Sequence, residues 1–315
     1  MIADSKRTIA VSSLGWVDHG ALWVYRHDGE TIDSAPLSDA KYLSLHVGRN
    51  DCFAVVHHYE KERVEVTAHR FSRLDEPEGR VVVAGNEAHF AGETRVWREV
   101  AHHYVAYVRG PLWSDFALIA LYPDEDRIEL QTFEWYGDQY DKGYQGIVGV
   151  TEVPGSPLVI VSVQRDSRPI LYDPVSRLKR GEITLASRGG NPTLCFREGA
   201  NELWADDYDT VLKLDGTTFS LLASRRLQGS PAGTAQFIGG FSFDASRALC
   251  LVARPFSGDV VAIDGRTLKT RYRCRTGAQP LEATMFGDDL VVARDWKTGA
   301  ILKGRMRRTW SFGWS

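Results

Sequence analysis

The chain has 315 residues, of which 43% are hydrophobic and 25% are charged, so it contains enough apolar side chains for a large packed core. Its 38 basic and 41 acidic residues give a formal net charge of −3, which disfavours a nucleic-acid backbone as the main partner. The first seven residues lack the apolar region of a signal peptide, and no apolar run approaches the roughly 20 residues that span a bilayer. We therefore expect a cytoplasmic protein.

Apolar runs follow one another along the chain in units that repeat every 43 to 52 residues. A polar residue precedes the first strand of each unit, at Lys41, Glu93, Gln145, Asn191, Gln236 and Gln279. The residues before Lys41 fit the same register without a first strand. The repeat predicts one supersecondary unit used many times.

Within each unit, the runs are rich in Val, Ile, Leu, Phe and Tyr, which is typical of half-buried strands. The expected second strands cover 8–14, 52–57, 104–108, 158–163, 202–205, 248–253 and 290–293. The third strands cover 21–26, 64–71, 116–121, 169–172, 210–214, 259–263 and 299–303, and fourth strands include 31–36, 80–84, 130–135, 219–224 and 269–274. The chain is therefore predicted to be all-β.

A turn sequence, Asp-Gly-x-Thr, recurs at 28–31, 215–218 and 264–267. Looser copies begin at Asp124, Asp173 and Asp295. In such turns the Asp side chain accepts a hydrogen bond from the backbone two residues on, and Gly accepts a positive φ. A hairpin turn that returns with each strand-rich unit predicts a β-propeller.

The number of units predicts seven blades in one domain over residues 1–315, with six blades as the alternative. The run at 309–314 alternates in the manner of a strand. We expect it to pair with the N-terminal blade, because closing the ring removes sheet edges that would otherwise invite aggregation.

An apolar strand, then Asp-Gly-x-Thr, then another strand resembles the repeats of quinoprotein-like and YVTN-repeat propellers. The stretch Glu202-Leu203-Trp204-Ala205 is also similar to the streptogramin lyase family. The resemblance implies the propeller architecture over nearly the whole chain. Its motifs are structural, and no catalytic residues of these families match positions of this chain.

In a propeller, loops between the second and third strands share one face with the loops that lead into the next blade. Arginines recur in the former loops, at Arg109, Arg165, Arg254 and Arg294, and aromatic residues accompany them, at Trp16, Tyr59, Trp113, Tyr208, Phe256 and Trp296. Guanidinium groups suit carboxylates, phosphates and sulfates, whereas aromatic rings stack on sugars and act as interface anchors. The alternative is a solvated rim in which Arg pairs with nearby Asp.

A long loop at 134–145 is rich in aromatic and acidic residues, and long loops in compact folds are often functional. From this loop we include Trp135, Tyr140 and Gln145 in the candidate binding face. Asn191, Gln236 and Gln279 are expected at the channel mouth, where a ring of amides would hold a ligand or structural water.

The histidines and cysteines suggest no metal site and no cofactor. His19, His57 and Tyr59 are candidates for a catalytic base on the same face. Cys52, Cys195, Cys250 and Cys274 have no short ligand spacing, so we interpret them as packed thiols.

The functional hypothesis is a propeller that binds an anionic or carbohydrate ligand, or a protein partner, through its loop face rich in Arg and aromatic residues. The alternative is a propeller lyase, lactonase or hydrolase that acts on a carbohydrate or lactone with a His or Tyr base. The sequence leaves open whether the protein is an enzyme.

Overall fold

The computed structural model describes most of the chain between Ile2 and Arg308, and its described side chains begin at Val150. The described ranges are 2–4, 8–12, 20–26, 31–37, 40–47, 52–60, 63–70, 73–84, 98–100, 103–109, 115–122, 127–134, 147–163, 168–176, 178–185, 193–197, 199–227, 238–244, 247–286, 289–295, 297–298 and 300–308. Two compact units span Ala3–Pro192 and Thr193–Ser315, and each is described by itself. No helix within these ranges is long and apolar enough to cross a membrane.

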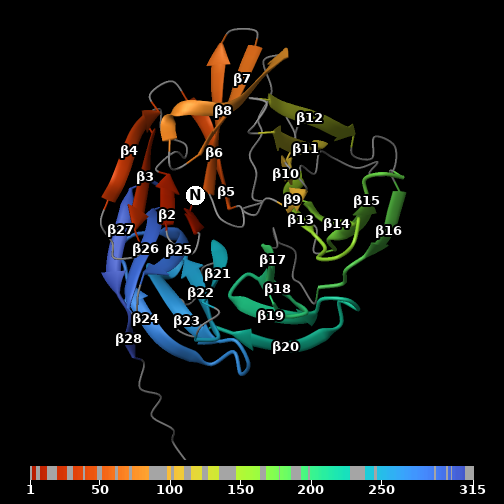
Figure 1. The fold of residues 1–315 in the computed structure, drawn as a ribbon. Coiled ribbons are helices and arrows are strands. Elements are labelled where there is room, and N and C mark those ends of the chain that lie inside the picture. The colour runs from red at the N-terminus through yellow and green to blue at the C-terminus, as the bar shows by residue number, and fades with distance from the viewer. Residues whose placement is uncertain are drawn as a thin grey trace, which may run out of the picture. The chain divides into compact units, whose positions relative to one another are not determined.

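The first unit consists of strands that pair in chain order within each meander (Figure 1). They are β1 (Ile2–Asp4), β2 (Thr8–Ser12), β3 (Gly20–Arg26), β4 (Thr31–Leu37), β5 (Ala40–Val47), β6 (Cys52–Glu60), β7 (Arg63–Arg70), β8 (Arg73–Ala84), β9 (Arg98–Val100), β10 (His103–Arg109), β11 (Asp115–Tyr122), β12 (Arg127–Glu134), β13 (Ile147–Glu152), β14 (Val159–Val163), β15 (Ile170–Asp173) and β16 (Leu178–Glu182). They form successive four-stranded meanders, and one parallel pairing of Arg80 with Arg127 joins the second meander to the third.

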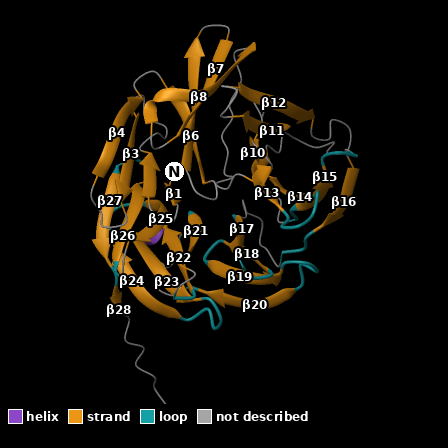
Figure 2. Ribbon diagram, in the orientation of Figure 1, coloured by secondary structure: helices purple, strands orange, loops and turns teal. Residues whose placement is uncertain are grey.

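The second unit continues the pattern (Figures 1 and 2). Its strands are β17 (Leu194–Arg197), β18 (Glu202–Asp207), β19 (Thr210–Asp215), β20 (Leu221–Arg226), β21 (Gly240–Asp244), β22 (Leu249–Arg254), β23 (Asp259–Asp264), β24 (Thr270–Arg275), β25 (Pro280–Phe286), β26 (Leu290–Asp295), β27 (Ile301–Arg305) and β28 (Arg307–Arg308). They form the sheets β17–β20, β21–β24 with β28 added at the outer edge, and β25–β27.

Three expectations about strand limits in the first unit are wrong. The fourth strand that was expected over 80–84 begins at Arg73. The first meander contains a first strand of its own, β1, so the residues before Lys41 form a complete four-stranded sheet. The second strand that was expected to end at His57 continues to Glu60, because its antiparallel pairing with β7 extends to Arg63. The described strands form seven meanders. The blade count and the pairing of 309–314 stay predictions, since residues after Arg308 lie outside the described part.

The middle strands of the second unit are buried on both faces, whereas the outer strand β20 is largely exposed. One core cluster lies between the sheets β17–β20 and β21–β24, and the fully buried Trp204 contacts Phe241 and Phe243 edge to face within it. A second cluster joins β21–β24 to β25–β27 through residues such as Val260 and Val291. Packing of one sheet on the next explains why both alternating sides of β22 are apolar.

The predicted Asp turns are confirmed in the second unit. Asp215 Oδ1 accepts hydrogen bonds from the backbone N–H groups of Thr217 at 2.9 Å and Thr218 at 2.7 Å. Asp264 repeats this arrangement with Arg266 at 3.0 Å and Thr267 at 2.8 Å. These bonds stabilise the hairpins between β19 and β20 and between β23 and β24.

The expected role of glycine in these turns is wrong. The positive φ falls on Phe219, at 57°, and on Leu268, at 56°, and not on Gly216 or Gly265. A Cβ on Gly216 would lie 2.5 Å from the Asn201 side-chain oxygen. These glycines therefore permit close approach of a neighbouring loop, which is the other use of a residue without a side chain.

The turn at Asp295 has the same hydrogen bonds in a different hairpin. Asp295 Oδ1 accepts the N–H groups of Lys297 at 3.0 Å and Thr298 at 2.8 Å, between β26 and β27. Those are the second and third strands of their meander, whereas the turns of Asp215 and Asp264 join third to fourth strands. The motif is therefore a general reversal and does not mark one position in the repeat.

Gly239 provides a test of how closely two sheets of the second unit approach. A Cβ at this position would lie 2.0 Å from the backbone oxygen of Leu281 at the start of the next sheet. We expect Gly239→Ala to destabilise the fold by about 2 kcal/mol or more, because backbone cannot move aside as a side chain can. Urea unfolding will measure this. Gly181→Ala is the matched control, since a Cβ there meets nothing within 4 Å. Equal stability of the two variants would contradict the close approach.

Candidate functional site

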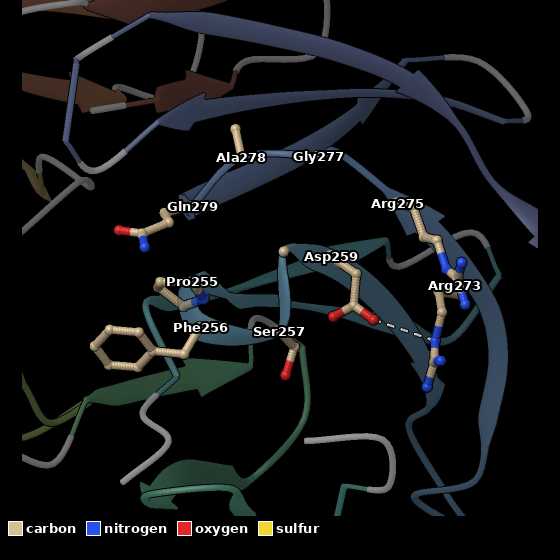
Figure 3. A pocket seen from close by; sticks show the side chains of 10 residues that line it. Pro255, Phe256, Ser257, Asp259, Arg273, Arg275, Gly277, Ala278 and Gln279 are labelled. Atoms are coloured by element: carbon tan, nitrogen blue, oxygen red, sulfur yellow. Dashed lines mark ion pairs between the residues drawn. The ribbon is translucent and has the colours of Figure 1, made fainter. Parts of the chain in front are cut away.

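An open pocket of about 490 Å³ lies at one end of the sheet β21–β24 (Figure 3). Two loops form it: the short 3-10 helix η2 (Pro255–Ser257) with Gly258, which joins β22 to β23, and the segment 276–279 that leads from β24 to β25. These loops belong to the two classes that were predicted to share a face. In this sheet that prediction is confirmed.

Local backbone chemistry holds the two loops together. Pro255 begins η2, and Gly258 ends it in the left-handed conformation with φ of 65°, where its N–H donates to the Pro255 carbonyl. The Gly258 carbonyl then accepts hydrogen bonds from both the backbone N–H and the hydroxyl of Thr276, each at 3.0 Å. Thr276 thus attaches the loop after β24 to the loop after β22.

A buried charge network forms the floor of this region. Arg254 and Asp259 are register partners at the ends of β22 and β23, and their side chains are only 3% and 4% exposed. Arg254 Nε and a terminal guanidinium nitrogen donate to the two Asp259 oxygens at 2.7 and 2.6 Å. Arg273 Nε lies 3.2 Å from the same carboxylate (Figure 3). One carboxylate therefore serves two guanidinium groups.

The expectation that Arg254 and Arg294 stand at an accessible rim is wrong. Both are buried, because each lies within the end of a second strand rather than beyond it. Arg254 forms the ion pair with Asp259 beneath the pocket. Arg294 is not among the pocket-lining residues, and its Nε finds no hydrogen-bond acceptor within the described residues.

Phe256 and Gln279 do line the pocket, as members of the predicted face. Phe256 is 39% exposed, and Figure 3 shows its ring on the side of the pocket away from Arg273 and Arg275. The Gln279 backbone N–H donates to Asp295 Oδ2 at 2.8 Å, which fixes the end of the loop. The pocket thus has an apolar side near Phe256 and a cationic side formed by the two arginines.

Tyr208 belongs to the neighbouring sheet and does not line this pocket. It lies in the turn between β18 and β19 with φ of 57°.

Close by in the sequence, Asp206 is buried and accepts the Thr193 N–H. Burial raises the pKa of Asp206 to about 8, although the N–H groups of Thr193 and Ile238 act in the opposite direction.

The other predicted site residues are not among the described residues that line this pocket. Arg109 ends β10, and His57 and Tyr59 lie within β6, where the backbone alone is described. Trp16, His19, Trp113, Trp135, Tyr140, Gln145, Arg165, Asn191, Gln236 and Trp296 lie outside the described residues. Their roles stay predictions.

The sequence reasoning missed Asp259, Arg273 and Arg275. A signal for two of them was present: basic residues alternate along the outer strand β24, at Arg271, Arg273 and Arg275. Alternate residues share one face of a strand, so the last two arrive together beside the loop that leads to Gln279. The predicted fourth strand, 269–274, ends before Arg275, whereas the strand in the structure includes it.

Of the cysteines, Cys250 and Cys274 are buried and Cys195 is partly buried, in agreement with packed thiols. Burial raises the pKa of the Cys250 thiol, which keeps it protonated and unreactive. Cys52 lies in β6, and its side chain is not described. Within the described residues, no group of three or more His, Cys, Asp or Glu side chains is placed to hold a metal ion.

Comparison with known proteins shows the fold. No protein-family model and no curated protein match the sequence. The β-propeller domain of Cps50 (Swd1) from Myceliophteria thermophila superposes with a TM-score of 0.66 and 10% identity, covering 97% of this chain and 98% of that one. The chain is a β-propeller. BamB from Moraxella catarrhalis also superposes, with a TM-score of 0.56 and 10% identity over 97% and 96% of the two chains. At this identity the propellers share architecture alone.

The raised pKa of the buried Asp206 predicts that the stability of the protein depends on pH. Its pKa is about 8 when folded, against an ordinary value of 3.8, so the folded state retains a proton that the unfolded chain loses between these values. The contribution of Asp206 to stability is therefore fully present below pH 3.8 and is lost as the pH rises to about 8. We expect Asp206→Asn to gain thermal stability relative to wild type between pH 5 and pH 8.5. Melting temperatures across this range will measure it, with Asp289→Asn as control, because the Asp289 side chain is exposed. Parallel profiles for wild type and Asp206→Asn would contradict the assignment.

The Arg254–Asp259 pair predicts a second, distinct effect. Arg254→Ala leaves a buried carboxylate without its bidentate partner, and we expect a loss of about 3–5 kcal/mol of unfolding free energy. Adding Asp259→Ala removes the orphaned charge, so the double variant is expected to recover part of the loss. Urea unfolding is the measurement. Arg305→Ala is the control, because its pair with Asp289 is exposed and contributes at most about 1 kcal/mol. A loss at Arg254 no larger than at Arg305 would contradict the network.

Proposed function

We propose that this β-propeller binds an acidic segment of a partner protein at the pocket formed by η2 and the loop 276–279. The observation that carries the proposal is the pairing of an exposed aromatic ring, Phe256, with the cationic side of one open pocket. Aromatic and arginine side chains are the residues most often found as energetic anchors of protein interfaces.

The charge of the pocket supports an anionic partner. Asp259 is the acidic residue of the lining, and its carboxylate is already bound by Arg254 and Arg273. Arg275 is exposed and has no ion-pair partner within the described residues. Arg275 thus leaves one guanidinium group of the lining without a charged partner among the described residues, and a guanidinium presents a planar fork that matches a carboxylate ligand.

The shape of the pocket supports a macromolecular partner over a small molecule. Small-ligand sites bury most of the ligand between largely apolar walls. Here Phe256, Arg275 and Gly277 are all exposed, so a small ligand would stay in contact with solvent. A peptide segment would gain further contacts on the surface around the rim.

This pocket gives no support to the alternative lyase, lactonase or hydrolase. Its described lining contains no His, Tyr or Cys side chain. The carboxylate of Asp259 is held by Arg254 and Arg273, so its oxygens are already occupied by these guanidinium groups. The chemistry that the pocket offers is recognition of an anion.

Selection of random peptides on immobilised wild-type protein will test the proposal. We expect the recovered peptides to be rich in Asp and Glu, and an aromatic or aliphatic side chain to accompany the acidic residues. Phe256→Ala is expected to weaken binding of a recovered peptide by about tenfold or more, as truncation of an interface anchor does. Fluorescence anisotropy with the labelled peptide will measure the affinity.

Leu222→Ala is the matched control for this experiment. Leu222 is an exposed apolar residue of the same unit, on the outer strand β20 and outside the pocket. Its loss should leave the affinity unchanged. Failure to enrich acidic peptides, or equal binding by wild type and Phe256→Ala, would overturn the proposed function.

A further inference from the structure

The outer edge of the sheet β21–β24 carries an unusual pairing of like charges. Strand β28 pairs with β24 so that Arg307 lies opposite Arg273, and Arg308 lies opposite Tyr272. Like charges directly opposite each other on antiparallel strands destabilise a sheet. A pairing of this kind gains stability when an anion lies between the two side chains.

Three arginines share one face at this edge. Arg273 and Arg275 are two residues apart on β24, so their side chains leave the same face of the strand with Cα atoms roughly 6.8 Å apart. Arg307 is the register partner of Arg273 and therefore lies on that face as well, with a Cα separation of about 5 Å. The long side chains from three such positions can reach one common point.

The described residues supply too little negative charge for this group. Asp259 lies directly opposite Arg275 in the register, but its carboxylate is held by Arg254 and by Arg273. Neither Arg275 nor Arg307 has an ion-pair partner within the described residues, and both are exposed. Together with Arg254, the cluster contains four guanidinium groups and one carboxylate, which leaves an excess of three positive charges.

We propose that Arg273, Arg275 and Arg307 bind the phosphate of a phosphorylated serine or threonine in the partner segment. The inference rests on the proposed function, since it specifies the chemistry of the segment that occupies the pocket face. A phosphate monoester carries a charge of about −1.5 to −2 and three strong acceptor oxygens. It therefore satisfies several guanidinium groups at once, whereas a carboxylate supplies one charge and two oxygens.

The neighbouring pocket favours a phosphate that is part of a protein chain. Arg273 and Arg275 form the cationic side of the pocket, and Phe256 lies on its other side (Figure 3). A segment that places its phosphate on the arginines thus has an adjacent aromatic surface for the residues beside it. This arrangement matches recognition of phosphorylated motifs by arginine clusters.

Three degenerate peptide pools will test the inference, identical except for a central phosphoserine, serine or glutamate. We expect wild-type protein to bind the phosphoserine pool about tenfold more tightly than either other pool. Arg275→Ala/Arg307→Ala is expected to abolish this preference, and inorganic phosphate is expected to compete with the phosphoserine pool. Fluorescence anisotropy at low and high salt is the measurement, and binding should weaken as salt rises.

Arg226→Ala is the control, because Arg226 is also exposed on an outer strand of this unit but is paired with Asp209. Melting temperatures of all variants will show that the fold is retained. Equal binding of the phosphoserine and glutamate pools, or a preference that survives in the double variant, would overturn the inference. If acidic peptides still require Phe256 in that case, the proposed function stands. If no peptide depends on Phe256 either, both fail.

Discussion

The buried carboxylate of Asp259 is the interaction on which the loop face of the second unit depends. It begins β23, pairs in register with Arg254 at the end of β22, and receives Arg273 from β24. Three successive strands are thus tied together at the end where η2 begins. Because a buried charge must be matched by its partners, the pair fixes both the backbone of the loop and the direction of Arg273. The positions of the charged groups that line the pocket follow from this structural pair.

Close packing between sheets gives that end of the sheet a rigid support. Gly239 approaches the backbone of Leu281 at this end, whereas at the opposite end of the sheet the Lys213 ammonium group donates to the Gly265 carbonyl at 3.1 Å while it pairs with Glu202. These contacts, like the Trp204 cluster, join one sheet of the unit to the next. A loop on such a scaffold needs little reorganisation to bind, which favours affinity.

The sequence predicted the fold class well and the site in part, for physical reasons. Turn chemistry is local, so the hydrogen bonds of Asp215 and Asp264 could be read from four residues. The need for glycine at position 216 could not be read in this way, because it depends on the close approach of Asn201 from another loop. The burial of Arg254 likewise depends on a partner, Asp259, whose position in the register is set only by strand pairing. Arg307 lies on the same face of the sheet as Arg273 because β28 pairs with β24. A strand of only two residues cannot be recognised from its sequence.

The formal net charge of −3 says little about what this face attracts, because the acidic residues of the unit are used locally. Asp215 and Asp264 are held by backbone N–H groups of their own turns, which lower the pKa of each carboxyl. Both lie where third strands end, whereas the pocket lies where β23 begins and β24 ends. Their charge is thus removed from the pocket by the length of a strand, and at that distance salt screens much of it. The charged residues of the described pocket lining, Arg273, Arg275 and Asp259, therefore sum to +1, although the chain as a whole carries a formal charge of −3.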